Sequence, residues 1–153
     1  YHGLGDLFVF LFFGLAATAG TTFAQTGTWE PLSLGLGTAL GCFGAGVLTV
    51  NNLRDLDTDE PAGKRTLAVR LGRRRARAWF AFLMMAPYAV VVAAMASGRT
   101  NPLAFAVLLT GLRGASLVLT VARRRDGPAL NAALAGTAQL QALFGLLLAA
   151  SLL

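Results

Sequence analysis

The residues of this chain best suited to carry out chemistry are three aspartates spaced two residues apart, Asp55, Asp57 and Asp59. If the preceding helix continues through them, Asp55 and Asp59 lie one turn apart on the same face. Two carboxylates placed this close repel each other unless a positive charge lies between them, and Mg²⁺, which prefers oxygen ligands, is the usual one. Lys64 and Arg65 follow within reach of any phosphate that such an ion would hold. The pattern predicts a site for Mg²⁺ and a diphosphate.

The roles expected within this segment differ from residue to residue. We expect Asp55 and Asp59 to be the principal metal ligands, and Asp57, on another face of the same turn, to be a third candidate. Asn51 and Asn52 lie where apolar sequence meets charged sequence, so their amides need hydrogen-bond partners and are candidates to orient a substrate. The alternative is a solvated acidic loop whose aspartates pair with neighbouring arginines.

The sequence around this segment has the composition of a membrane protein. Hydrophobic residues make up 56% of the 153 residues, charged residues make up 13%, and the mean hydropathy is +0.63. A soluble domain of this length would need a more polar surface. Each of five apolar runs approaches the roughly 20 residues that a helix needs to cross a bilayer, so we predict an all-α, polytopic transmembrane bundle. The runs are Leu7–Ala24, Leu32–Val50, Ala76–Ala96, Pro102–Ala122 and Leu130–Leu152.

Basic residues are concentrated between these runs. Eight of the thirteen Lys and Arg residues lie within Arg54–Arg77, and three more form the run Arg123–Arg125. This clustering follows the positive-inside rule, which predicts that loops 51–75 and 123–128 face the cytoplasm. It accounts for the formal net charge of +6 without a nucleic-acid partner. We therefore expect a multi-pass protein of the cytoplasmic membrane, surrounded by lipid, with the aspartate segment on the cytoplasmic side.

The loop after the aspartates has its own local signals. Pro61 and Gly63 are expected to end any helix there, so that Lys64 turns back over the aspartates. Thr66–Leu71 has the pattern of a short amphipathic helix at the membrane surface. A loop this long and this charged in an otherwise tight bundle is typical of a functional segment.

Two features inside the apolar runs also predict contacts. Gly37 and Gly41 form a G-x-x-x-G pattern, which lets another helix backbone approach closely. Arg113 lies near the middle of the fourth run, where a charge in lipid is costly, so it is expected to face the bundle or a cavity.

The longer string around the aspartates resembles a known family. Asn51-Asn-Leu-Arg-Asp-Leu-Asp-Thr-Asp59, followed by Ala62-Gly-Lys-Arg-Thr-Leu-Ala-Val-Arg-Leu-Gly72, is similar to the second aspartate-rich motif of the UbiA superfamily of intramembrane aromatic prenyltransferases. The opening Gly3-Leu-Gly-Asp6 and the final run from Leu130 also resemble segments of that family. The asparagine pair favours the branch that prenylates 1,4-dihydroxy-2-naphthoate in menaquinone synthesis.

This resemblance implies a function and a cofactor. A family member would transfer a polyprenyl chain from polyprenyl diphosphate to an aromatic acceptor in a Mg²⁺-dependent reaction, here giving demethylmenaquinone. The aspartates would then be metal ligands, and Lys64 and Arg65 would bind the diphosphate. Transfer to another acceptor such as 4-hydroxybenzoate, and a non-catalytic membrane protein or transporter fragment, are the alternatives.

The resemblance also implies that this chain is part of a larger protein. The family fold has nine transmembrane helices and carries a first motif, N-D-x-x-D, in its N-terminal half. No second acidic pair occurs in this sequence, and the chain begins at Tyr1 rather than Met. We therefore expect residues 1–153 to form a single transmembrane domain, the C-terminal half of the enzyme. Without its N-terminal half, this part alone would be inactive.

Overall fold

The computed structural model describes residues Gly3–Leu153, which form helices and connecting turns without a strand among them. Five helical segments are long and apolar enough to cross a membrane, which confirms the predicted number of spans and the all-α class. Their bounds are Gly5–Thr26, Pro31–Arg54, Leu67–Ala96, Ala104–Arg123 and Gly127–Ala150. In chain order the elements are α1 (Gly5–Val9), the π-helix η1 (Phe10–Gly20), α2 (Thr21–Thr26), α3 (Pro31–Arg54), α4 (Leu56–Asp59), α5 (Leu67–Ala96), α6 (Ala104–Leu109), α7 (Gly111–Arg123) and α8 (Gly127–Ala150).

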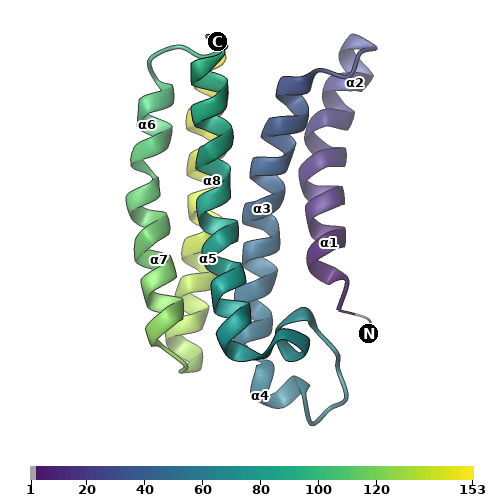
Figure 1. Ribbon diagram of the computed structural model, residues 1–153, viewed down its shortest axis with the longest axis vertical. Coiled ribbons are helices and arrows are strands. Elements are labelled where there is room, and N and C mark those ends of the chain that lie inside the picture. Colours follow the sequence, from purple (N-terminus) through teal and green to yellow (C-terminus); the bar gives the residue numbers. More distant parts are fainter. Residues whose placement is uncertain (1–2) are drawn as a thin grey trace.

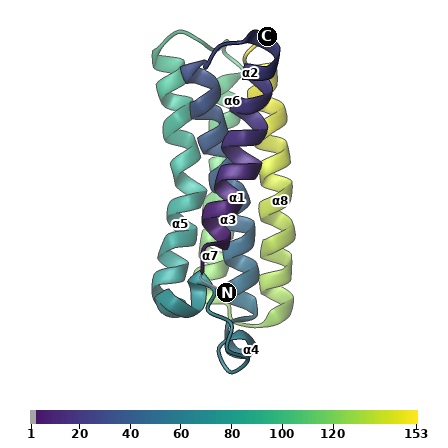
Figure 2. The same ribbon diagram turned by 90° about the vertical axis from the view of Figure 1, so that its right-hand side faces the viewer.

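The spans run up and down the long axis of one bundle (Figures 1 and 2). The N-terminal end of α1, the short helix α4 and the turn between α7 and α8 lie at the same end, and the C-terminus lies at the other. Helix α3 is central, because η1, α5 and α8 all pack on it. The aspartate segment therefore emerges from the helix that contacts the most neighbours.

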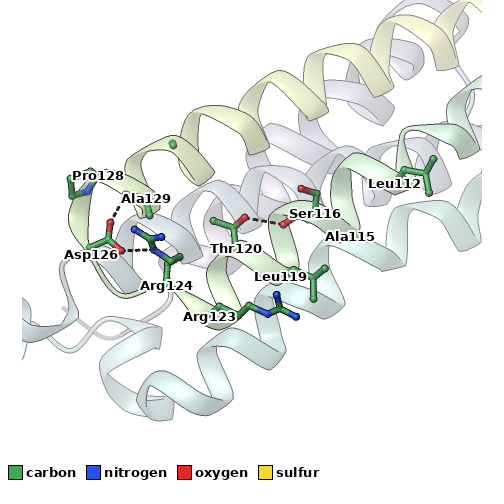
Figure 3. Close-up of a pocket in the computed structure, with 11 residues that line it drawn as sticks. Leu112, Ala115, Ser116, Leu119, Thr120, Arg123, Arg124, Asp126, Pro128 and Ala129 are labelled. Carbon is green, nitrogen blue, oxygen red and sulfur yellow. Dashed lines mark hydrogen bonds and ion pairs between the residues drawn. The ribbon is translucent and has the colours of Figure 1, made fainter.

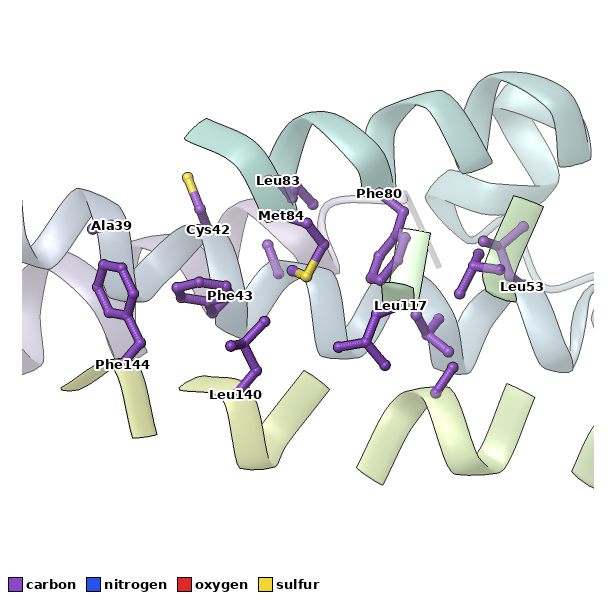
Figure 4. Packing of buried hydrophobic residues seen from close by; sticks show 14 of the residues in the cluster. Ala39, Cys42, Phe43, Leu53, Phe80, Leu83, Met84, Leu117, Leu140 and Phe144 are labelled. Atoms are coloured by element: carbon purple, nitrogen blue, oxygen red, sulfur yellow. The ribbon is translucent and has the colours of Figure 1, made fainter. Parts of the chain in front are cut away.

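Two different kinds of packing surround α3. Toward α5 and α8 the contacts are made by large side chains, and the rings of Phe43 and Phe144 meet edge to face with centroids 4.9 Å apart (Figure 4). Toward η1 the contacts are made by glycines, since a Cβ added to Gly41 would lie 2.8 Å from the carbonyl oxygen of Phe10. A Cβ at Gly37 would lie 3.1 Å from the carbonyl oxygen of Gly14, which confirms the predicted close helix approach.

The chain turns sharply between α3 and α5. Helix α3 stops at Asp55, whose φ of −91° and ψ of 3° are not helical, and α4 follows as a separate short turn. Gly63 has a φ of +73°, and the amide of Lys64 then donates to the carbonyl oxygen of Asp59 at 3.0 Å. Lys64 is thus folded back over the aspartates, as predicted.

A short helical segment precedes the long part of α5. Thr66 caps it by accepting a hydrogen bond from the amide of Val69 at 3.3 Å. The helix is then broken at Gly72, where φ is 73° and ψ is 158°. The predicted short helix at Thr66–Leu71 is therefore present, as the first turns of α5 on the N-terminal side of Gly72.

Candidate functional site

The guanidinium of Arg54, at the end of α3, is surrounded by side-chain oxygens. Its Nε and Nη2 donate to the two carboxylate oxygens of Asp55 at 2.7 and 2.6 Å. Nη2 also donates to Oδ1 of Asn51 at 2.9 Å, and Nη1 donates to Oδ1 of Asn131 on α8 at 2.7 Å. One positive charge thus holds together oxygens from two helices far apart in the sequence.

This arrangement sets the protonation state of Asp55. Its side chain is partly exposed, and the hydrogen bonds from Arg54 lower the pKa of the Asp55 carboxyl below its ordinary value. Burial opposes that shift, and the charge of Lys64 adds to it. Asp55 is consequently an anion at neutral pH.

Asp59 is the most buried of the three aspartates. Only 5% of the residue is exposed, and its carboxylate accepts a hydrogen bond from Nζ of Lys64 at 2.8 Å. Its amide donates to the carbonyl oxygen of Asp55 at 2.8 Å, which keeps the helical spacing of the two residues across the end of α3. The predicted one-turn relation between Asp55 and Asp59 is therefore present in the backbone, even though α3 itself ends before Asp55.

Asp57 points the other way. Its side chain is 80% exposed and makes two contacts with Nη2 of Arg73, at 2.8 and 2.7 Å. Arg73 also donates to the carbonyl oxygen of Leu53 at 3.1 Å, which ties the start of α5 to the end of α3. Asp57 therefore takes part in an ion pair on the outside of the loop.

The structure thus pairs the three aspartates with three different cations. Within residues Gly3–Leu153, no three His, Cys, Asp or Glu side chains gather closely enough to hold a metal ion by themselves. Asn51 joins the Arg54 cluster, whereas Asn52 is buried and lines a separate cavity beside Thr66. Arg65 is exposed. Arg113 is exposed as well, so the prediction that it faces the interior of this bundle is wrong for the part of the chain that the structure describes.

Two contributors to the Arg54 cluster were absent from the set predicted from the sequence. Arg54 directly precedes Asp55, so an ion pair between these two neighbours could have been predicted from the sequence. Asn131 lies 77 residues away, and only the packing of α8 beside α3 brings it to Arg54. Its signal in the sequence is slight, namely one amide near the start of an otherwise apolar run.

The chemistry of these donors fits a magnesium ion. The carboxylates of Asp55 and Asp59 and the amide oxygens of Asn51 and Asn131 are hard oxygen ligands of the kind that Mg²⁺ selects. In the structure the oxygens of Asp55, Asn51 and Asn131 bind Arg54, and an oxygen of Asp59 binds Lys64, so each set already stabilises a positive charge. A divalent cation bound with one or two of these carboxylates and with phosphate oxygens agrees with that donor set.

A separate cavity of about 720 Å³ lies between α7 and α8 (Figure 3). Arg124 donates to Asp126 at 2.8 Å at one end of it, and Asp126 caps α8 by accepting from the amide of Ala129 at 3.1 Å. These hydrogen bonds, the one from Arg124 being the stronger influence, lower the pKa of Asp126 to about 2. The cavity wall is otherwise mainly apolar, and the acidic loop contributes nothing to it.

Known proteins resemble this chain over half or all of its length. It is 44% identical over 85 residues to a 1,4-dihydroxy-2-naphthoate octaprenyltransferase of Escherichia coli, an alignment covering 56% of this chain and 28% of that relative. A Mycobacterium tuberculosis protein of the same name is 47% identical over 77 residues, covering 50% and 26%. A Bacillus subtilis protein of that name is 26% identical over 153 residues, covering all of this chain and 49% of the relative.

The chain therefore spans about half the length of a relative that matches it from end to end. No solved structure matches it. The UbiA prenyltransferase family matches residues 1–148, which is nearly the whole sequence. Together with the five apolar helices and the aspartate segment at one end of the bundle, this match places the chain in the UbiA prenyltransferase family.

Proposed function

We propose that the complete protein containing this chain transfers a polyprenyl chain from polyprenyl diphosphate to 1,4-dihydroxy-2-naphthoate. Diphosphate and the ring carboxylate, as CO₂, would leave, giving demethylmenaquinol, the reduced form of demethylmenaquinone. The observation that carries this proposal is the set of oxygens around Arg54 at the end of an apolar bundle. These oxygens are ligands suited to Mg²⁺, which would in turn bind a diphosphate head, and apolar helices suit a prenyl tail. The names of the similar proteins supply the acceptor.

Each residue of the loop has a role in this proposal. Asp55 and Asp59 would hold Mg²⁺, with Asp57 as a weaker third ligand. Bound there, the ion would supply positive charge to the departing diphosphate. Lys64 and Arg65 bind the diphosphate oxygens, because ammonium and guanidinium groups are strong donors to phosphate.

The two asparagines act on substrate position. Asn51 is held by Arg54 at the rim of the loop, where its amide can orient the diphosphate. Asn52 is 8% exposed and lies deeper, on the side where an acceptor would approach from the bundle. Their different surroundings support different tasks, one toward each substrate.

The proposal includes a second part of the protein. An N-terminal half with an N-D-x-x-D motif would supply the opposite side of the diphosphate site, and this chain alone would be inactive. By the positive-inside rule the loop faces the cytoplasm, in the cytoplasmic membrane. Both substrates would then reach the site from that side.

The test is a transfer assay with the complete protein in lipid vesicles. We expect prenylation of 1,4-dihydroxy-2-naphthoate in the presence of Mg²⁺, loss of product when EDTA is added, and a clear preference over 4-hydroxybenzoate in competition. Asp55→Asn should lower the rate by about a hundredfold or more, because the neutral amide is a poor Mg²⁺ ligand. Asp126→Asn, which alters an aspartate at the same end of the bundle, is the matched control and should keep the wild-type rate.

Three results would contradict the proposal. Preferred transfer to 4-hydroxybenzoate would retain the reaction but change the acceptor. Full activity of Asp55→Asn, or of the wild type in EDTA, would remove the metal mechanism. No transfer to any aromatic acceptor would favour a non-catalytic membrane protein.

A further inference from the structure

A second carboxylate lies deeper in the bundle than the acidic loop. Asp6, on α1, is 5% exposed. Its Oδ2 accepts hydrogen bonds from the hydroxyl of Thr49 at 2.8 Å and from the indole N–H of Trp79 at 3.1 Å. Its Oδ1 is buried and has no hydrogen-bond partner among residues Gly3–Leu153.

This half-satisfied carboxylate is unusual in physical terms. Aspartate is rarely buried this fully unless a cation or several donors surround it. Thr49 and Trp79 are both neutral donors, and both bind the same oxygen of the carboxyl group. The free oxygen is therefore a strong acceptor that a bound molecule with an O–H group would satisfy.

A cavity lined by Asp6 is also lined by Asn52 and Thr66, which lie before and after the acidic loop in the sequence. It has a volume of about 290 Å³, and its polar lining comes from Asp6, Asn52 and Thr66. Most of the remaining wall is apolar, with Phe8 and Leu48 among its side chains. Few polar groups in an otherwise apolar cavity are typical of a site for a small organic ligand.

The position of the cavity connects it to the proposed reaction. Thr49, which holds Asp6, precedes Asp55 on α3 by six residues, or roughly 9 Å of helix rise. Thr66, which also lines the cavity, caps the helix that follows Lys64. A flat ligand in this cavity would thus contact the segments of the chain that directly precede and follow the acidic loop.

We propose that Asp6 binds the aromatic acceptor by accepting a hydrogen bond from one of its ring hydroxyls, with Thr49 and Trp79 fixing the carboxylate for that purpose. This inference rests on the proposed function, because it assigns the acceptor to a place in the same reaction. The chemical class it selects is a hydroxylated aromatic ring. A ring without the matching hydroxyl would leave Oδ1 unsatisfied and would bind more weakly.

The experiment compares wild type and Asp6→Asn in the complete protein with three acceptors, 1,4-dihydroxy-2-naphthoate and its two monohydroxy analogues, 1-hydroxy- and 4-hydroxy-2-naphthoate. We expect the wild-type KM to be at least about tenfold higher for the analogue that lacks the contacted hydroxyl. Asp6→Asn should raise the KM for the diol by a similar factor, and its KM should no longer distinguish the diol from that analogue. KM is the constant compared, because a ring hydroxyl also activates the ring toward the prenyl carbon and so changes kcat. The KM for polyprenyl diphosphate should stay within about twofold.

A second variant controls for the case in which Asp6→Asn fails to fold. Trp79→Phe keeps the carboxylate and most of the ring but removes one of the two donors that orient Asp6. It should raise the acceptor KM by a smaller factor than Asp6→Asn and leave the diphosphate KM unchanged. Asp126→Asn again serves as the control that changes neither constant.

The outcomes separate this inference from the proposed function. If Asp6→Asn lowers the rates with all three acceptors by one common factor, or raises the diphosphate KM as well, Asp6 has a structural role and the inference is wrong while the reaction stands. If the wild type prenylates none of the three naphthoates but another aromatic acceptor, or none at all, the proposed function fails and this inference fails with it.

Discussion

Two arginine–aspartate pairs lie at the same end of the bundle and have different surroundings. Arg54 and Asp55 meet at 2.6 Å at the end of α3, and Arg124 and Asp126 meet at 2.8 Å before α8. The first pair has side chains that are 28% and 35% exposed, whereas those of the second are 60% and 43% exposed. Distance alone does not distinguish them.

The two arginine–aspartate pairs differ in the other groups that they bind. Arg54 also binds the amide oxygens of Asn51 and of Asn131 on another helix. Asp126 instead binds the amide of Ala129 three residues along, so its cluster is a local helix cap. An ion pair between neighbours in the sequence is common and contributes little by itself. Arg54 instead binds oxygens from two separate helices, and this makes the cluster around Arg54 a candidate site.

Removing each arginine in turn tests whether the two pairs have different roles. In the complete protein, Arg54→Gln should lower prenyl transfer by about a hundredfold, since Asp55 and two amides lose a charged donor together. Arg124→Gln should change the rate by less than about twofold, because its pair is exposed and local. Steady-state assays at saturating Mg²⁺ measure both. Equal losses in the two variants would mean that the Arg54 cluster has no special role.

A smaller effect is expected from the helix that completes the cluster. Asn131→Ala removes one of the hydrogen bonds to Arg54 and should lower kcat/KM for polyprenyl diphosphate by about tenfold. Gln139→Ala is the matched control, because it deletes another amide on the exposed side of α8. If both variants behave like the wild type, α8 does not contribute to the site.

Features of the fold that depend on residues close together in the chain could be predicted from the sequence. Five continuous apolar runs of membrane-spanning length determine the spans, so their number and approximate bounds were predictable from hydropathy. The bend at Gly63 and the break at Gly72 both occur at glycines, the residue type that most readily adopts the positive φ found there. These features depend on residues close together in the chain.

The site was predictable only in part, because its remaining contacts join distant segments. The spacing of Asp55 and Asp59 predicted that they lie one helical turn apart, and the hydrogen bond between their backbones agrees with this. The contact of Asn131 with Arg54 depends on how α8 packs on α3. The contact of Trp79 with Asp6 joins residues 73 positions apart. No local pattern contains either contact.

A third prediction concerns the ion pair on the outside of the loop. Asp57→Asn should reduce transfer by about threefold, far less than Asp55→Asn, because its side chain is exposed and faces Arg73. Titration of activity with Mg²⁺ measures any change in metal affinity. A loss as large as that of Asp55→Asn would make Asp57 a full metal ligand and would move the centre of the site away from Arg54.

The smallest expected effect is on stability, and it depends on pH. The folded-state pKa of Asp126 is about 2, below its ordinary value of 3.8, so the stabilisation from its pair is fully present above pH 3.8 and is lost as the pH falls toward 2. Asp126→Asn, which retains a capping side chain, should therefore lower the melting temperature in detergent by about 2 °C or less at pH 7, and the difference should shrink below pH 3.8.

Asp55→Asn should show a dependence of the same sign with a larger difference at pH 7, because the pKa of Asp55 is also lowered and its partner Arg54 is less exposed than Arg124. Adding about 0.5 M salt should reduce the Asp126 difference more than the Asp55 difference, since solvent ions screen exposed pairs most effectively. Thermal unfolding of the wild type and both variants at pH 7, 4 and 2.5 measures these shifts. Identical salt and pH responses of the two variants would show that the partners contributed by separate helices add nothing to the Arg54 pair.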